Sequence, residues 1–136
     1  MPMEHESSIE LTVVVPAWNE AADIVATVSA LRDALAELGR PSELLVVDDA
    51  SDDATARLAV NAGATVLSVE KRQIAAVRNA GAAATDGRLL IFVDADTIVP
   101  SETLRELIRA VEDGAAIAGP RVEMPGVKSN FNRLWT

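Results

Sequence analysis

The stretch Leu-Leu-Ile-Phe-Val-Asp-Ala-Asp, residues 89–96, decides how the rest of the chain is interpreted. Its five apolar residues predict a buried strand, and two aspartates follow that strand almost at once. Asp94 and Asp96 stand where the backbone leaves strand geometry, so both carboxylates can approach one hard cation. Mg²⁺ prefers a few carboxylates combined with phosphate oxygens and water. Taken alone, the two aspartates fit an acidic strand-to-helix turn better than a metal site, because aspartate suits turns. Their position directly after the apolar run makes the two interpretations equally good.

The same order, an apolar run followed by a polar cluster, occurs three more times along the chain. Each aliphatic or β-branched run predicts a strand. Polar residues follow the runs as Trp18-Asn19-Glu20 after Leu11–Val15, Asp48-Asp49 after Leu44–Val47, and Glu70-Lys71-Arg72 after Ala64–Val69.

Apolar residues at helical spacing lie between these strands and predict helices. Ile74, Val77, Gly81 and Ala84 mark the buried face of one of them. Ala115–Ala118 is a candidate fifth strand. The predicted helices run from Ile24 to Leu38, from Ser51 as N-cap through Leu58, from Ile74 to near Gly87, and from Pro100-Ser101 through Val111.

Strands that alternate with helices predict an α/β fold with a mostly parallel sheet and helices on both faces. Ligands in such sheets bind beyond the carboxyl ends of the strands, where the four polar clusters collect, so we expect one composite site. We expect a disordered tail over residues 1–8, one domain over residues 9–124, and an irregular tail over residues 125–136.

Charge and composition exclude several classes of function. The net charge of −9 argues against a nucleic-acid binder and against electrostatic attachment to an anionic membrane. The chain has no cysteine, which excludes disulfides and thiolate metal sites. Residues 1–10 are polar and lack the order of a secretory signal, which predicts a cytoplasmic chain. The single histidine, His5, lies in the predicted tail, so a Ser-His-Asp triad is not expected.

Several candidate binding residues have both a functional and a structural interpretation. Asp48 or Asp49 could accept hydrogen bonds from a nucleobase or ribose, or cap the following helix. Trp18 could stack on a planar base or simply pack. Arg72 and Arg78 could bind a diphosphate, or pair with surface carboxylates. The chain has neither a Gly-x-Gly-x-x-Gly nor a P-loop motif, which argues against the usual dinucleotide and P-loop sites.

Four segments in order resemble the opening half of family-2 glycosyltransferases, over roughly Ile9 to Val122. They are Val-Val-Val-Pro-Ala-Trp-Asn-Glu (13–20), Leu-Val-Val-Asp-Asp-Ala-Ser-Asp-Asp (45–53), Val-Arg-Asn-Ala-Gly (77–81) and Phe-Val-Asp-Ala-Asp (92–96). The resemblance implies a Rossmann-like GT-A nucleotide-diphospho-sugar transferase fold, here truncated. It also implies a nucleoside-diphosphate-sugar donor and Mg²⁺ or Mn²⁺.

The resemblance also assigns roles to individual residues. Asp49, with Asp48, would contact the base, and Asp94 would lie near the ribose or donor sugar. Asp96 would bind the metal. The nucleoside pocket would be lined by Pro16, Trp18 and Glu20, and Arg72 and Arg78 would reach the nucleotide and diphosphate.

By resemblance, the reaction is an inverting displacement, in which an acceptor hydroxyl attacks the anomeric carbon. The acceptor could be a glycan, a lipid or a small molecule. The family's acceptor-side base lies well downstream of Asp-x-Asp, and Glu123 is too early to match it. We therefore expect an enzyme that is incomplete in this chain, placed in an intact protein at the inner face of a membrane.

Two other hypotheses stay open at this point. One is a non-catalytic nucleotide-sugar-binding module, completed by another subunit. The other is a nucleotidyltransferase, although Pro16-Ala17-Trp18-Asn19-Glu20 is not the Gly-rich, Arg-containing loop typical of that class. A truncated sheet would also leave apolar surface uncovered, so we expect the chain to form homo-oligomers or to aggregate at low salt.

Overall fold

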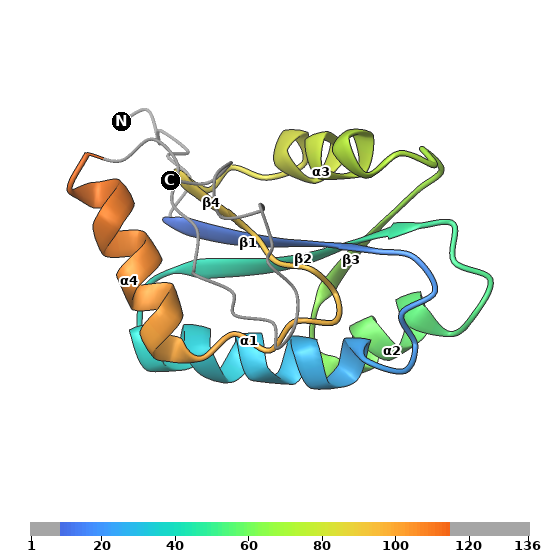
Figure 1. Cartoon of the computed structure of the whole chain (residues 1–136), viewed down its shortest axis with the longest axis horizontal. Helices are drawn as coiled ribbons and strands as arrows, with labels where there is room; N and C mark the ends of the chain where they lie inside the picture. The colour runs from blue at the N-terminus through green and yellow to red at the C-terminus, as the bar shows by residue number, and fades with distance from the viewer. Residues whose placement is uncertain (1–8, 115–136) are drawn as a thin grey trace, which may run out of the picture.

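The structure, a computed structural model, describes residues 9–114 (Figure 1). Strands and helices alternate in these residues, and all strand pairs are parallel in the order β3-β2-β1-β4. The elements are β1 (Leu11–Ala17), α1 (Ile24–Leu38), β2 (Ser42–Asp49), α2 (Thr55–Ala62), β3 (Thr65–Val69), α3 (Ile74–Ala83), β4 (Leu89–Phe92) and α4 (Ser101–Glu112).

Helices cover both faces of the sheet, which confirms the predicted α/β architecture. Helix α3 lies on one face, and α1 and α2 lie on the other (Figure 1). The predicted strand at 115–118, the boundary at residue 124, both predicted tails and Glu123 lie outside the described residues. No helix within residues 9–114 is long and apolar enough to cross a membrane.

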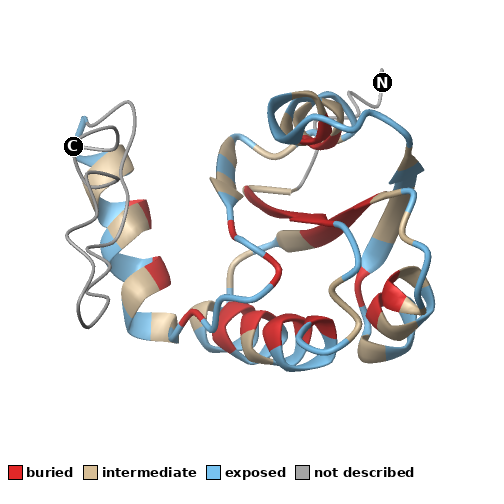
Figure 2. Cartoon of the chain, turned by 45° about the vertical axis from the view of Figure 1, so that its right-hand side comes forward, coloured by how far each residue is buried: buried red, intermediate tan, exposed pale blue. Residues whose placement is uncertain are grey.

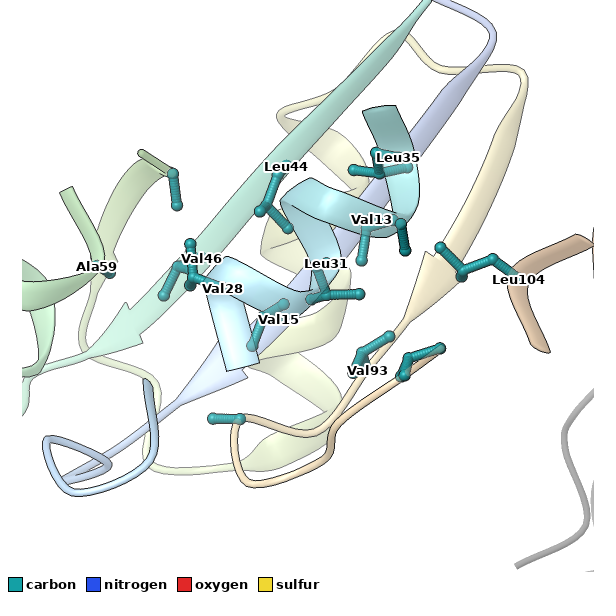
Figure 3. Packing of buried hydrophobic residues seen from close by; sticks show 14 of the residues in the cluster. Val13, Val15, Val28, Leu31, Leu35, Leu44, Val46, Ala59, Val93 and Leu104 are labelled. Carbon is teal, nitrogen blue, oxygen red and sulfur yellow. The ribbon is translucent and has the colours of Figure 1, made fainter. Parts of the chain in front are cut away.

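The alternation of side chains along β1 divides the core into two clusters. Val13 and Val15 point to the α1 face, where they pack with Val28 and Leu31 (Figure 3). Val14 points to the α3 face and packs with Leu45, Val47 and Val77. Period-two alternation in a central strand that is buried on both faces explains why all seven residues of β1 are buried.

Pro16 lies within β1 although proline cannot donate a ladder hydrogen bond. Its position makes this tolerable. Val93 N donates to Val14 O, so the backbone polar groups of Val14 point toward β4, and those of Pro16 point the same way. The pairing of β1 with β4 ends at Val14, so the missing N–H of Pro16 falls beyond the last pair.

Helix α2 differs from its predicted position. The prediction placed it from Ser51 to Leu58, but it runs from Thr55 to Ala62. The hydroxyl of Ser51 accepts a hydrogen bond from Asn19 N and donates one to Asp48, so it does not cap the helix. Residues 50–54 instead form a loop at the carboxyl end of the sheet (Figure 1).

Strand β4 is less buried than its apolar sequence predicts. Among the strands of residues 9–114 it lies at an edge of the sheet, and Leu90 and Phe92 are 40% and 38% exposed. Their register partners in β1 are Thr12 and Val14, so both point to the α3 face. Burial is concentrated on the other face of the sheet, along α1 (Figure 2).

Helix α4 packs on the α1 face of the sheet, beside β4. Leu104 and Ile108 are buried in the same cluster as Val13 and Leu31. An arginine ties the far end of this helix to the sheet, because Arg40 Nε and Nη1 lie 2.8 Å and 2.6 Å from the carboxylates of Glu10 and Glu112. These hydrogen bonds raise the pKa of Arg40 above its ordinary value.

Candidate functional site

An open cavity of about 730 Å³ lies at the carboxyl ends of the strands. This is the edge where the composite site was predicted. Seven of the nine predicted site residues line it: Pro16, Trp18, Glu20, Asp49, Arg72, Asp94 and Asp96. The remaining lining residues are Ala17, Ala50, Asp52, Gln73, Ile74, Val77 and Ala95. Residues up to 80 positions apart in the sequence, from Pro16 to Asp96, therefore line the same cavity.

The backbone takes an unusual conformation in the loop that follows each of β1, β2 and β3. Asn19, Ala50 and Arg72 have φ values of 50°, 52° and 55°, and in residues 9–114 these are the non-glycine residues with positive φ. Left-handed conformations are costly for residues with a Cβ and persist where the surrounding contacts fix them. Ala50 and Arg72 line the cavity, and Asn19 lies between the lining residues Trp18 and Glu20, so the contacts that fix these residues help to shape it.

Asn19 links the loop after β1 to the loop after β2. Its backbone N–H donates to Ser51 Oγ at 2.9 Å, and its side-chain Oδ1 accepts from Asp52 N at 2.8 Å. Ser51 in turn donates to the carboxylate of Asp48, a residue that is only 6% exposed. Asp48 therefore stabilises the loop through Ser51, and it is not among the residues that line the cavity. Its contact with a base stays a prediction.

A second set of hydrogen bonds links the same two loops one turn further on. Glu20 N donates to Thr55 Oγ1 at 2.9 Å, and Ala21 N donates to Asp53 Oδ2 at 3.2 Å. Asp53 also accepts from the backbone N–H and the hydroxyl of Thr55. The hydroxyl bond of Thr55 is the largest cause that lowers the pKa of Asp53.

Asp49 holds the loop after β3. Its carboxylate accepts the backbone N–H of Lys71 at 2.6 Å and that of Arg72 at 3.0 Å. The guanidinium of Arg72 lies 3.3 Å from Glu70, and both side chains are largely exposed. Arg72 therefore reaches the cavity from a fixed backbone with a movable side chain.

Arg78 pairs with the first aspartate of Asp94-Ala95-Asp96. Its Nη2 lies 3.6 Å from Asp94 Oδ1, and its buried Nε has no hydrogen-bond partner in the described part of the chain. Arg78 is absent from the cavity lining but contacts Asp94, which belongs to that lining. Its contact with a diphosphate stays a prediction.

The acidic side chains give the cavity a negative potential. Burial raises the pKa of Glu20 above its ordinary value, and the charge of Asp96 raises it further, followed by Asp23, Asp53 and Asp94. A pKa raised by neighbouring carboxylates indicates that a cation would be stabilised at this point.

The residues present fit a divalent cation that takes part of its shell from a ligand. Asp94 and Asp96 are both exposed at the cavity. No group of three His, Cys, Asp or Glu side chains in residues 9–114 is arranged to hold a metal ion. Mg²⁺ is commonly bound by one or two carboxylates together with phosphate oxygens and water. The donor set therefore suits a cation that arrives with a diphosphate.

Sequence reasoning missed several contributors to the site. Ile74 was placed on the buried face of its helix, but it is 55% exposed and lines the cavity with Gln73. Ser51 and Asp53 were interpreted as helix-start residues, and their cross-loop bonds carry no sequence signal. Thr27, buried on α1, donates to the carbonyl of Ala95. A polar residue among the apolar positions of that helix was the one visible sign.

Comparison with known proteins agrees with this geometry. The chain is 33% identical over 132 residues to the succinoglycan biosynthesis protein ExoO of Rhizobium meliloti, covering 93% of this chain and 37% of that protein. It is 30% identical over 118 residues to the undecaprenyl-phosphate 4-deoxy-4-formamido-L-arabinose transferase of Klebsiella pneumoniae, covering 81% of this chain and 36% of that enzyme.

Solved structures with the same fold include one that holds a nucleotide and a metal. Glucosyl-3-phosphoglycerate synthase from Mycobacterium tuberculosis, in complex with Mg²⁺ and uridine diphosphate, matches with a TM-score of 0.68 and 28% identity over 81% of this chain and 42% of that one. The same enzyme has been solved with Mn²⁺, UDP-glucose and phosphoglyceric acid, and matches with a TM-score of 0.64 and 27% identity over 81% of this chain and 42% of that one.

The chain spans about two fifths of the length of these relatives. The parallel sheet with helices on both faces matches the fold of GT-A glycosyltransferase structures. A family model described as glycosyl transferase family 2 matches residues 12–135 of the 136, and the chain therefore belongs to that family.

Proposed function

We propose that the cavity binds the nucleoside diphosphate of a nucleotide-sugar donor together with Mg²⁺ or Mn²⁺, for transfer of the sugar to an acceptor by the whole protein. One observation carries this proposal. The cavity brings an exposed indole, a loop-fixed aspartate and an Asp-x-Asp pair to the same end of the sheet. A base, a diphosphate and a cation need complementary groups of these kinds.

The nucleoside end of the ligand is assigned to Trp18 and Asp49. Trp18 lines the cavity and is 60% exposed, so its indole is accessible for stacking on a base. The two oxygens of Asp49 already accept backbone N–H groups, but a carboxylate offers about four acceptor positions, so one stays available for a base N–H.

The diphosphate end is assigned to Arg72 and Asp96. The exposed guanidinium of Arg72 can leave Glu70 at little cost and form paired hydrogen bonds with phosphate oxygens. Asp96 would hold the cation, and Asp94 stays paired with Arg78 beside it. A bound divalent cation supplies charge neutralisation for the leaving diphosphate.

The reaction class that fits these assignments is a direct displacement. The oxygen of an acceptor hydroxyl forms a bond to the anomeric carbon, and its proton passes to a carboxylate base. The bond from that carbon to the diphosphate breaks, and its electron pair stays on the phosphate oxygen. Arg72 would stabilise the charge that develops there.

Calorimetric titration of the folded chain with UDP, GDP and UMP, each with and without Mn²⁺, tests the proposal. We expect a nucleoside diphosphate to bind more tightly in the presence of Mn²⁺, and UMP to gain much less because it lacks the second phosphate. Removal of the metal with a chelator should reverse the gain. A folded chain that binds neither diphosphate, or binds UDP and UMP with the same response to Mn²⁺, would contradict it.

A further inference from the structure

We infer that Thr27 is a positioning residue for Asp94 and Asp96, an inference that rests on the function proposed above. Thr27 lies on α1, in the second turn, and is 0% exposed. It touches neither the cavity nor either carboxylate in the described contacts. Its effect on the site therefore passes through the residue between the two aspartates.

Burial alternates along Asp94-Ala95-Asp96. Ala95 is 3% exposed and belongs to the cluster that contains Ile24, Val28 and Val99, whereas the aspartates on either side are exposed. The buried alanine is therefore the point at which this loop is attached to the core. Any shift of Ala95 would move both carboxylates with it.

Besides this packing, one buried hydrogen bond attaches Ala95 to a residue 68 positions earlier in the sequence. Thr27 Oγ1 donates to Ala95 O at 2.6 Å. A threonine within a helix usually directs its hydroxyl to the carbonyl three or four residues earlier in the same helix. Here the hydroxyl bonds to the aspartate loop instead, which leaves its own helix without that contact and fixes the loop.

Other contacts in residues 9–114 also hold this loop, among them the ion pair of Asp94 with Arg78, but they do not involve the carbonyl of Ala95. Val93 N donates to Val14 O at 3.0 Å, which holds the start of the loop to the sheet. Thr97 N donates to Asp94 O at 3.0 Å, which closes a turn within the loop. Loss of the Thr27 hydroxyl would leave a buried carbonyl without its donor, a state that proteins avoid by moving the group toward water.

The chain offers a matched control in Thr12. It is also 0% exposed, and its hydroxyl has no hydrogen-bond partner in residues 9–114. A threonine-to-valine exchange at either position replaces a hydroxyl with a methyl group of similar size. Only the exchange at Thr27 removes a hydrogen bond to the aspartate loop.

The test compares UDP affinity with and without Mn²⁺ for the full chain and for Thr27→Val, Thr27→Ser and Thr12→Val. Groups that orient a metal ligand typically change metal affinity by about 10- to 100-fold, and we expect a loss of this order in the Mn²⁺-dependent gain for Thr27→Val. Thr27→Ser retains the hydroxyl and should keep the gain, as should Thr12→Val. If Thr27→Val does not fold, Thr27→Ala takes its place with the same expectation.

Hydrogen exchange of the metal-free protein gives a readout that needs no ligand. Amides of residues 94–97 should exchange faster in Thr27→Val than in Thr12→Val. A Thr27→Val protein with the wild-type gain from Mn²⁺ and wild-type exchange would overturn this inference alone. A folded wild type without any Mn²⁺-dependent UDP binding would overturn the proposed function, and this inference with it.

Discussion

The carboxylate of Asp49, at the end of β2, accepts the backbone N–H of Arg72 in the loop after β3. The N–H of Arg72 lies 3.0 Å from Oδ2 and 3.3 Å from Oδ1, and Arg72 has a φ of 55°. Charge-assisted acceptance of this N–H offsets the cost of the left-handed conformation. The same aspartate is assigned to the base, so base recognition and the placement of the arginine share one residue.

Asp49→Asn should loosen the loop after β3 and weaken nucleotide binding. The amide nitrogen cannot accept an N–H, and the charge is lost. We expect UDP affinity to fall about tenfold, or about 1.4 kcal/mol, with faster hydrogen exchange at residues 70–73. Glu70→Gln is the control, because the carboxylate of Glu70 pairs with the exposed guanidinium of Arg72 and not with its backbone. Equal exchange in the two variants would contradict the role of Asp49.

Asp53 should make stability fall as the pH is lowered. Its folded-state pKa is below the ordinary aspartate value of about 3.9, chiefly because the hydroxyl of Thr55 donates to it. A group with a lowered pKa stabilises the fold fully above its unfolded-state pKa, and the contribution is lost as the pH falls through the folded-state pKa.

Thermal melts of the wild type and Asp53→Asn from pH 7 to pH 3 measure this effect. The melting temperature of the wild type should exceed that of the variant at pH 7, and the difference should shrink below about pH 4. Asp52→Asn is a suitable control, because within residues 9–114 Asp52 takes part in the loop contacts through its backbone N–H, which donates to Asn19. A difference that stays constant over this range would rule out the assignment.

Gly81→Ala should destabilise the protein although alanine favours helices. A Cβ at Gly81 would lie 2.5 Å from Val14 Cγ1 and 2.9 Å from Val47 Cγ2. Overpacking typically costs about 1–3 kcal/mol, which exceeds the gain of about 1 kcal/mol from helix propensity. Denaturant unfolding measures the sign of the change in the free energy of unfolding. Ala75→Gly, at an exposed position of the same helix, measures the effect of helix propensity alone. A more stable Gly81→Ala would mean that α3 does not approach the sheet this closely.

The exposed face of β4 should drive self-association. Leu90 and Phe92 point to the α3 face of an edge strand and are partly exposed. Exposed apolar edge strands promote pairing with other chains, and lysine on such a strand opposes it. Light scattering should show a mass above that of a monomer for the wild type, and a smaller mass for Leu90→Lys combined with Phe92→Lys. A monodisperse wild-type monomer would contradict this expectation.

Periodicity was enough to predict the fold class because strands buried on both faces leave unbroken aliphatic runs. The run before Trp18 and the run before Asp48 both became central strands. Strand order was not visible in the same pattern. The run from Leu89 to Val93 is as apolar as a central strand, yet within residues 9–114 it lies at an edge of the sheet, since strand order is set by how the crossovers pack.

The candidate site was predictable where it lies at strand ends, and less so where loops cross. Asp49 ends β2, and Asp94 and Asp96 lie in the loop just after β4, so topology alone brings them to the same edge of the sheet. The start of α2 was misplaced because Ser51, Asp52, Asp53 and Thr55 can all begin a helix. Ser51 and Asp53 form cross-loop bonds, and tertiary contacts of that kind outweigh local capping preference.

The dependence of UDP affinity on Mn²⁺ in Asp96→Asn tests the central claim most directly. Asp86→Asn is its matched control, because Asp86 is an exposed aspartate in the loop before β4, at the opposite end of that strand from Asp96. The account predicts that Mn²⁺ strengthens UDP binding by the wild type and by Asp86→Asn, and that Asp96→Asn loses this gain while staying folded. An Asp96→Asn protein that keeps the full gain would contradict the account.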